Sequence, residues 1–344
     1  MAQFPDRAVV YGPASLKAER NSRPRTTPLH ASRQVQAASL LRSRPMRVYR
    51  GIVDSSRWSR FESRPDDVII STPPKCGTTW MQQLVGMILL DRVDFGASTV
   101  SPWLDVQVTS EDEVFQKLAE QSHRRFIKTH TPLDGIPRHG SWTYVVVFRH
   151  PLDAALSMRD HSINIDGDQF RSMFEAVTGE PLPAPTTTPP EDPEEFLRYW
   201  ISHDDDPKGA VPQGLFGFAT SLNAAWSLRN EPNVHLFHYD DLWHDLDGQM
   251  ARLAEILGVE LDSARRGRFV EAATLDSMRA RAQEMAPSAS GRQMWRDPAA
   301  FFKSGGRREW PTMLTAQEVE DVADRLESMV GPDAARWAFQ GGSD

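Results

Sequence analysis

Residues 66–90 read DDVIISTPPKCGTTWMQQLVGMILL, and they carry the strongest structural signal in the chain. An apolar run is followed by a short turn containing two prolines and a glycine, and then by two threonines that open a strongly apolar segment. This order predicts a buried strand, a tight loop and the N-terminus of a helix. The first N–H groups of a helix have no partner within the helix, so such a loop favours an anion at that point.

The side chains of the loop add to this preference for an anion. Lys75 supplies a full positive charge, and Thr78 and Thr79 supply hydroxyl donors. The lysine precedes the glycine, whereas the nucleotide-binding pattern G-x-x-x-x-G-K-[ST] has it after the glycine, and no predicted strand ends in an aspartate suited to Mg²⁺. We therefore expect the loop to hold one phosphate-like group without a metal. The alternative is a Pro-Pro turn and a capping threonine that only join strand to helix.

Beyond this stretch the chain alternates strand-like and helix-like segments. Apolar runs at 67–72, 125–130, 143–149 and 233–239 predict buried parallel strands. Helical patterns lie at 78–91, 111–121, 152–165, 217–230, 246–257 and 263–273, and a last helix from 315 begins with a Thr-x-x-Glu capping box. The sequence therefore predicts an α/β fold with a central parallel sheet flanked by helices on both faces.

Two stretches do not fit this alternation. Residues 181–195 are too rich in proline for either element, and residues 283–310 contain Gly, Ser, Arg and Trp without a period. Long loops in a compact sheet are typically lids or binding loops, and disorder is the alternative.

Composition limits the classes of protein to consider. A chain of 344 residues with 40% hydrophobic content can bury one large core or two modest ones. Its longest apolar runs are of strand length, so no transmembrane segment is expected. The single cysteine, Cys76, rules out an internal disulfide and fits a reducing cytoplasm. A net charge of −8 argues against a general nucleic-acid binder.

Residues 1–45 differ from the rest of the chain. They hold eight Lys and Arg against two Asp and Glu, are rich in Ser and Pro, and show no clear apolar period. This pattern predicts a basic, disordered leader. A targeting peptide of the Arg- and Ser-rich type is one alternative. An over-extended gene model is the other, because Met46 opens directly onto ordered-looking sequence.

Deleting residues 1–45 is therefore expected to leave folding and turnover intact, because a segment of this composition cannot sustain a packed core. Thermal unfolding and turnover of the shortened chain test this. Aggregation, or loss of most activity, would show that the leader docks on the folded domain.

The predicted strand at 125–130 ends in residues suited to catalysis. Lys128 and His130 lie at its carboxyl end, where α/β sheets place their ligands. A histidine there is a candidate general base, although a structural histidine with satisfied hydrogen bonds fits the sequence equally well.

Two further segments offer anion ligands. Arg149 lies at the end of the strand at 143–149, and Ser157 follows eight residues later within the next predicted helix. Both could bind a second anion, or Arg149 could be a surface charge. In FFKSGGRREW, residues 301–310, Lys303, Ser304 and two glycines could wrap a phosphate.

The segments PPKCGTTW, KTH, FRHPLDAALS and FFKSGG…EW occur in the order and approximate spacing of the cytosolic-type sulfotransferases, which use 3′-phosphoadenosine 5′-phosphosulfate (PAPS). The resemblance runs from about Met46 to the C-terminus. STVSPWLD, RRFIKTHTPLDG, NVHLFHY and ATLDSMR are similar to the actinobacterial glycolipid sulfotransferase branch of that family. The resemblance implies one P-loop-like sulfotransferase domain over residues 46–344, and it implies no metal.

The resemblance also implies which residues bind PAPS. The 5′-phosphate would be held by Lys75, Gly77, Thr78 and Thr79, together with the backbone N–H of Cys76, which stands where serine is usual. Trp80 would stack on adenine, with Tyr239 near the base. The 3′-phosphate would be held by Arg149, Ser157, Lys303, Ser304 and Gly305. Leu275 replaces an aromatic residue that often packs on adenine, and Pro311 and Ala316 depart from the family's dimer motif, which leaves the oligomeric state open.

Sulfuryl transfer needs positioning and charge stabilisation more than covalent chemistry. On this resemblance His130 would take the proton of the acceptor hydroxyl, Lys75 would meet the charge on the bridging oxygen, and Lys128 would polarise the transferring group. The resemblance favours a glycolipid acceptor, with a steroid, a phenol and a long-chain alcohol left open. The pocket for the acceptor could be lined by Trp103, Leu104, Trp142 and Phe170, or these four residues could belong to the hydrophobic core.

Two other classes of function stay open at this point. A small-molecule kinase on a related fold would need the Mg²⁺-binding pattern that the chain lacks. A non-catalytic adenine-nucleotide-binding protein would keep the anion loop but would not need His130.

Overall fold

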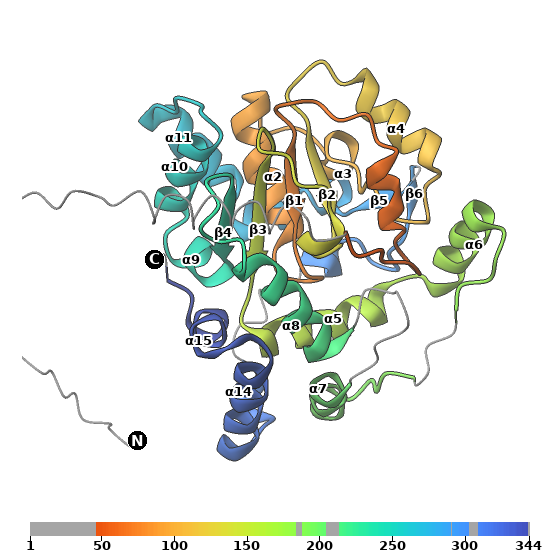
Figure 1. Cartoon of the computed structure of the whole chain (residues 1–344), viewed down its shortest axis with the longest axis vertical. Helices are drawn as coiled ribbons and strands as arrows, with labels where there is room; N and C mark the ends of the chain where they lie inside the picture. Colours follow the sequence, from red (N-terminus) through yellow and green to blue (C-terminus); the bar gives the residue numbers. More distant parts are fainter. Residues whose placement is uncertain (1–45, 184–187, 204–212, 290, 303–308, 343–344) are drawn as a thin grey trace, which may run out of the picture. The chain divides into compact units, whose positions relative to one another are not determined.

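The computed structural model describes residues 46–342, apart from 184–187, 204–212, 290 and 303–308. Its centre is a sheet of four parallel strands in the order β2-β1-β3-β4. The strands are β1 (Val68–Ser71), β2 (Phe126–Thr129), β3 (Thr143–Phe148) and β4 (Val234–His238). All four predicted strands are confirmed within one or two residues at each end. Figure 1 shows them side by side with helices on either side.

Both faces of the sheet are buried, as the continuous apolar runs predict. Val68 and Ile70 of β1 pack on one face against α2 (Thr78–Leu90), α10 (Leu246–Ile256) and α11 (Ser263–Ala272). Ile69 packs on the other face. The helices that share that second core are α4 (Glu111–Glu120), α5 (Pro151–Asn164), α7 (Pro193–Ser202), α8 (Gly214–Trp226), α14 (Ala316–Val330) and α15 (Pro332–Gln340).

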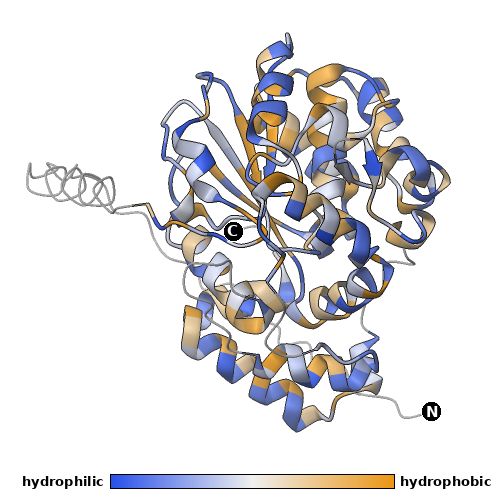
Figure 2. Ribbon diagram, turned by 90° about the vertical axis from the view of Figure 1, so that its right-hand side faces the viewer, coloured by the Kyte–Doolittle hydropathy of each residue, from blue (hydrophilic) through white to orange (hydrophobic). Residues whose placement is uncertain are grey.

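Most predicted helices are confirmed, although α8 lies three to four residues before the predicted 217–230. The capping box at the start of α14 is also confirmed, because the Thr315 hydroxyl and the Glu318 carboxylate each bond the other's backbone N–H. Figure 2 shows hydrophilic and hydrophobic residues alternating along the outer helices, as expected for helices with one buried side.

The described residues 181–183 and 188–192 are irregular, as predicted, but parts of the two stretches form short regular elements. α7 begins at Pro193, inside the proline-rich stretch, because Asp192 caps the N–H groups of Glu194 and Glu195. A proline at the first helical position loses no hydrogen bond, since its missing N–H would have had no partner. Within 283–310 the described residues form a two-stranded antiparallel sheet, β5 (Ser288–Ala289) and β6 (Arg292–Gln293), and the short helix η3 (Ala299–Phe302).

The helix expected from 315 is not the last, because α15 follows it, and the sequence analysis missed several other helices too. These are α3 (Ala97–Val100), α6 (Gly167–Thr178), α9 (Tyr239–His244), α12 (Leu275–Ala280) and α13 (Ala282–Met285), with the 3₁₀ helices η1 (Ser55–Ser59), η2 (Leu133–Gly135) and η4 (Trp310–Thr312). In the described part of the chain, no helix is both long enough and apolar enough to cross a membrane.

A buried ion pair ties the amino ends of β1 and β2 together. Arg125 donates from Nε to Asp67 Oδ1 at 2.7 Å and from Nη2 to Asp67 Oδ2 at 2.6 Å. Asp67 and Arg125 are 0% and 2% exposed. The guanidinium also lies 4.7 Å from the ring centroid of Phe61. This pair lies at the opposite end of the strands from the residues described next.

Candidate active site

The carboxyl ends of the four strands bring together most of the predicted site residues. The loop holding Lys75 follows β1, His130 follows β2, Arg149 follows β3 and Tyr239 follows β4. Because all four strands are parallel, these positions lie along one edge of the sheet.

The loop after β1, residues 72–77, together with the first turn of α2 has the backbone of an anion-binding site, which we call the cradle. Gly77 is the N-cap of α2 with φ +107°, and no side chain caps this helix end. This backbone angle favours glycine, and a Cβ at Gly77 would also lie in tight contact, 3.0 Å, with Cδ2 of Tyr239. Lys75 has φ +66°, an uncommon conformation for a residue with a side chain. The N–H groups of the first turn of α2 are thus left for a ligand.

The remaining loop residues are buried around this cradle. Thr78 and Thr79 are both buried, and the Thr78 hydroxyl is hydrogen-bonded to that of Thr72. The Cys76 side chain is fully buried, and burial raises the pKa of its thiol to about 12. Cys76 is therefore a core residue of the loop, and its thiol stays protonated near neutral pH.

Two lysines in this region, Lys75 and Lys128, have pKa values below the usual value of a lysine side chain. Burial and the nearby charge of Arg149 lower the pKa of Lys75 to about 8. Burial and the charge of Lys75 lower the pKa of Lys128 to about 7, while Asp105 acts in the opposite direction. Positive charges held together in a poorly solvated site favour a bound anion, because its negative charge would stabilise both ammonium groups.

His130 is half-buried beside these lysines. Its Nδ1 lies 2.7 Å from the backbone oxygen of Thr72, which can only accept, so Nδ1 carries the proton and Nε2 keeps its lone pair. Burial and the charges of Lys128 and Lys75 lower the pKa of His130 to about 3. The imidazole is therefore neutral at physiological pH and held in the tautomer that a base at Nε2 requires.

Arg149, Tyr239 and Trp80 form a stack beside the cradle. The Arg149 guanidinium lies 4.4 Å from the ring centroid of Tyr239, and the rings of Tyr239 and Trp80 meet edge to face at 5.1 Å. The Trp80 indole N–H donates to the backbone oxygen of Ala273 at 3.0 Å. Ser157 lies on α5, partly exposed. The predicted ligands Lys303, Ser304 and Gly305 lie outside the described residues.

The four residues considered for the acceptor pocket separate into two groups. Leu104, Trp142 and Phe170 are buried in hydrophobic cores. Trp103 instead meets His130 edge to face, with ring centroids 4.7 Å apart. A small cavity of about 50 Å³ adjoins it, and its lining includes Lys128, Val106, Val108 and Met294. Of the four residues, Trp103 is therefore the one that lines a cavity at the site.

A family model described as a sulfotransferase domain matches residues 65–331. The chain belongs to the sulfotransferase family. It is 38% identical over 311 residues to a glycolipid sulfotransferase of Mycobacterium bovis, covering 86% of this chain and 94% of the relative. It is 37% identical over 310 residues to a glycolipid sulfotransferase of Mycobacterium tuberculosis, with the same coverage.

Solved structures share the fold of this sulfotransferase at low identity. A mouse sulfotransferase complexed with PAP has a TM-score of 0.60 at 17% identity, covering 83% of this chain and 92% of the mouse chain. A retinol dehydratase in complex with androsterone and PAP has a TM-score of 0.57 at 17% identity, covering 86% and 88% of the two chains. The predicted P-loop-like α/β fold is thereby confirmed.

Sequence reasoning missed three residues that support the site. Thr72 fixes the His130 tautomer through its backbone, and Phe301 lies 4.4 Å from Lys75 Nζ, measured to the ring centroid. Asp105 is 0% exposed and accepts hydrogen bonds from both threonines that flank His130. A signal for Asp105 was present, because Thr129 at the end of a buried strand and Thr131 just after it are polar residues that each need a partner.

Proposed function

We propose that this sulfotransferase moves the sulfuryl group of PAPS to a hydroxyl of a lipid acceptor, and that the acceptor is a glycolipid. The observation that carries the proposal is the His130 imidazole, fixed through Nδ1, with buried Lys128 and half-buried Lys75 beside the uncapped N-terminus of α2. The names of the mycobacterial relatives support the acceptor class. The PAP in the related solved structures supports the donor.

We assign the donor site to the residues that the cradle and the stack bring together. The N–H groups at the start of α2, with Lys75, Thr78 and Thr79, would hold the 5′-phosphate. Arg149 and Ser157 would bind the 3′-phosphate, together with Lys303, Ser304 and Gly305. Trp80 and Tyr239 would contact the adenine, because their rings lie in contact with each other beside the cradle.

PAPS supplies a sulfuryl group that its mixed anhydride bond already activates. His130 Nε2 would accept the proton of the acceptor hydroxyl as the new O–S bond forms. Lys75 would stabilise the negative charge left on the bridging oxygen as the old S–O bond breaks, and Lys128 would stabilise the sulfuryl oxygens. The products are a sulfate ester and 3′,5′-bisphosphoadenosine (PAP).

Incubation of the purified protein with PAPS and a total lipid extract tests this proposal. We expect PAP release in step with sulfated lipids, identified by mass spectrometry, and sulfated glycolipids among them. A nucleotide-binding protein without catalysis would bind PAP but release none from PAPS, and a kinase would instead consume ATP. Sulfation of a phenol or sterol, with no sulfated glycolipid, would refute the proposed glycolipid acceptor but would support sulfuryl transfer from PAPS.

The domain boundary and the compartment belong to the same proposal. We assign catalysis to residues 46–344, since the family match lies within them. We place the reaction in the cytoplasm, because the chain's one cysteine is a buried free thiol.

PAP binding is expected to take up protons and to weaken as the pH rises. Lys128 and Lys75 have pKa values of about 7 and about 8, so both lose charge as the pH rises through this range. Bound phosphates stabilise the ammonium forms and raise these pKa values, so protons are taken up on binding. Calorimetry between roughly pH 6.5 and 9, in buffers of different ionisation enthalpy, measures both effects.

Lys75→Ala should weaken PAP binding by about 1–3 kcal/mol and reduce the proton uptake. Arg92→Ala is the matched control, because Arg92 is an exposed cation beyond the C-terminal end of α2 and pairs with Asp94 at 3.0 Å. If the wild-type protein bound PAP equally tightly at both ends of the pH range, the assignment of Lys75 and Lys128 as phosphate-binding cations would be contradicted.

A further inference from the structure

Asp105 is a buried carboxylate whose hydrogen-bond partners are all donors. Its Oδ2 accepts from Trp58 Nε1 at 2.9 Å, from Thr129 Oγ1 at 2.7 Å and from Thr131 Oγ1 at 2.6 Å. Its Oδ1 accepts from Trp103 Nε1 at 2.8 Å. Four donated hydrogen bonds suit an ionised carboxylate, which only accepts. Such an arrangement fixes each donor relative to the others.

Trp103 connects this carboxylate to the reacting groups. Its indole N–H is bonded to Asp105, and its ring lies 4.3 Å from Lys128 Nζ and meets His130 edge to face. The backbone is fixed as well, since Leu104 N donates to Lys128 O and Lys128 N donates to Pro102 O. With the backbone fixed, the hydrogen bond from the Trp103 N–H to Asp105 Oδ1 sets the rotation of the Trp103 ring.

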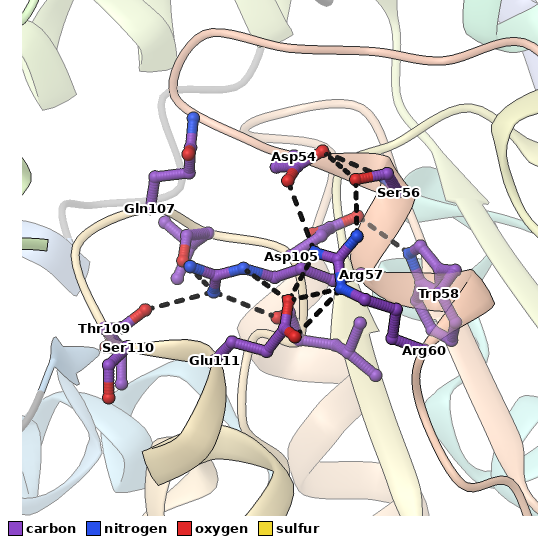
Figure 3. A network of polar contacts seen from close by, with 12 residues as sticks. Asp54, Ser56, Arg57, Trp58, Arg60, Asp105, Gln107, Thr109, Ser110 and Glu111 are labelled. Carbon is purple, nitrogen blue, oxygen red and sulfur yellow. Dashed lines mark hydrogen bonds and ion pairs between the residues drawn. The ribbon is translucent and has the colours of Figure 1, made fainter. Parts of the chain in front are cut away.

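The loop that carries Asp105 is also held from its other side. Arg57 donates to the backbone oxygens of Val106 at 2.7 Å and Thr109 at 3.0 Å, and Asp54 N donates to Asp105 O at 2.8 Å. Figure 3 shows this network, in which the Trp58 indole is joined to Asp105 and Arg57 reaches the same loop. A loop anchored at so many points holds the Asp105 carboxylate in one place, so the indole bonded to it has a defined position.

We propose that Asp105 is a positioning residue for sulfuryl transfer, which holds the Trp103 indole against His130 and Lys128 so that the base and the cation keep their places at the acceptor hydroxyl. It acts through Trp103 and does not touch the donor. The inference rests on the proposed function for its effect on rate. Its structural part, the hold of Asp105 on the Trp103 ring, can be measured without any turnover.

Asp105→Asn is the central variant, because an amide has nearly the same shape but must place an NH₂ group against a donor. We expect the rate of transfer from radiolabelled PAPS to a fixed lipid extract to fall on the order of tenfold or more, since small misplacements of reacting groups are costly. PAP affinity should stay within about twofold of wild type. Trp103→Phe keeps a ring but removes the N–H, so it should lower the rate in the same way.

A double-mutant cycle decides whether the two residues act as one unit. If Asp105 acts through Trp103, the double variant should be no slower than the worse single variant. Trp58→Phe is the control, because it removes one donor from Asp105 and leaves the Trp103 contact in place. Multiplied losses in the double variant, or an equal loss in Trp58→Phe, would overturn the proposal.

Histidine-selective NMR of the free protein supplies the readout that needs no acceptor. The ring signals of His130 are identified from His130→Ala, and Trp103→Ala shows where they lie without the ring current of the indole. In Asp105→Asn they should move toward that position, because the indole is no longer held against His130. Unchanged His130 signals in Asp105→Asn would refute the inference. If Asp105→Asn does not fold, wild-type rate and PAP affinity in Trp103→Phe would refute it. A wild-type protein that sulfates nothing would instead refute the proposed function.

Discussion

His130→Ala should lower turnover on the order of a hundredfold or more and leave PAP affinity nearly unchanged. The imidazole is anchored by its Nδ1 to the Thr72 backbone, and its Nε2 is the atom proposed to take the proton of the acceptor. Its low pKa keeps it neutral, so it adds little charge to the phosphate sites. The loss should therefore fall on the chemical step, measured as steady-state rate beside calorimetric titration of PAP.

His123→Ala is the matched control for this prediction. His123 lies before β2, and its Nδ1 is 2.9 Å from the backbone oxygen of Arg124, away from the edge that holds the cradle. It should keep wild-type turnover. Near wild-type turnover in His130→Ala, or a loss of PAP binding as large as that of Lys75→Ala in a folded protein, would refute the role of His130 as the base.

Asp67→Ala should lower the free energy of unfolding by about 3–5 kcal/mol, because it leaves the Arg125 guanidinium buried without its carboxylate. Both side chains are almost fully buried, so water cannot replace the lost partner. Urea unfolding measures the change. The protein that stays folded should keep its turnover, since the pair lies at the opposite end of the strands from the cradle.

Asp168→Ala is the comparison for a surface ion pair. Asp168 pairs with Arg171 within α6, where both side chains are more than half exposed. Its removal should change stability by no more than about 0.5 kcal/mol, as is usual for surface substitutions. An Asp67→Ala variant as stable as Asp168→Ala would show that Arg125 finds another partner or reaches water.

The strands and the cradle could be predicted from the sequence because their signals are local. Four apolar runs had the length of buried strands, and a Pro-Pro-Lys-Cys-Gly turn followed by two threonines predicted an uncapped helix end. The polar residues after each strand could be assigned to one edge because parallel strands all end on the same side of a sheet. The brief helices were missed because their periods are too short to stand out. The start of α7 was missed because residues 193–195 belong to a proline-rich stretch that resembles a loop.

The parallel α/β fold, the anion cradle after β1, and Lys128, His130 and Arg149 as candidate ligands or catalytic groups could all be predicted before the chain's folded structure was known. The folded structure was needed to show that the Thr72 backbone fixes the His130 tautomer and that Trp103 lies against His130 while Trp142 is a core residue. It was also needed to show that Asp105 accepts four hydrogen bonds. The reason is physical: strand and turn preferences arise within a few residues of chain. Tautomers, lowered pKa values and buried hydrogen bonds depend on groups that meet only after the chain has folded.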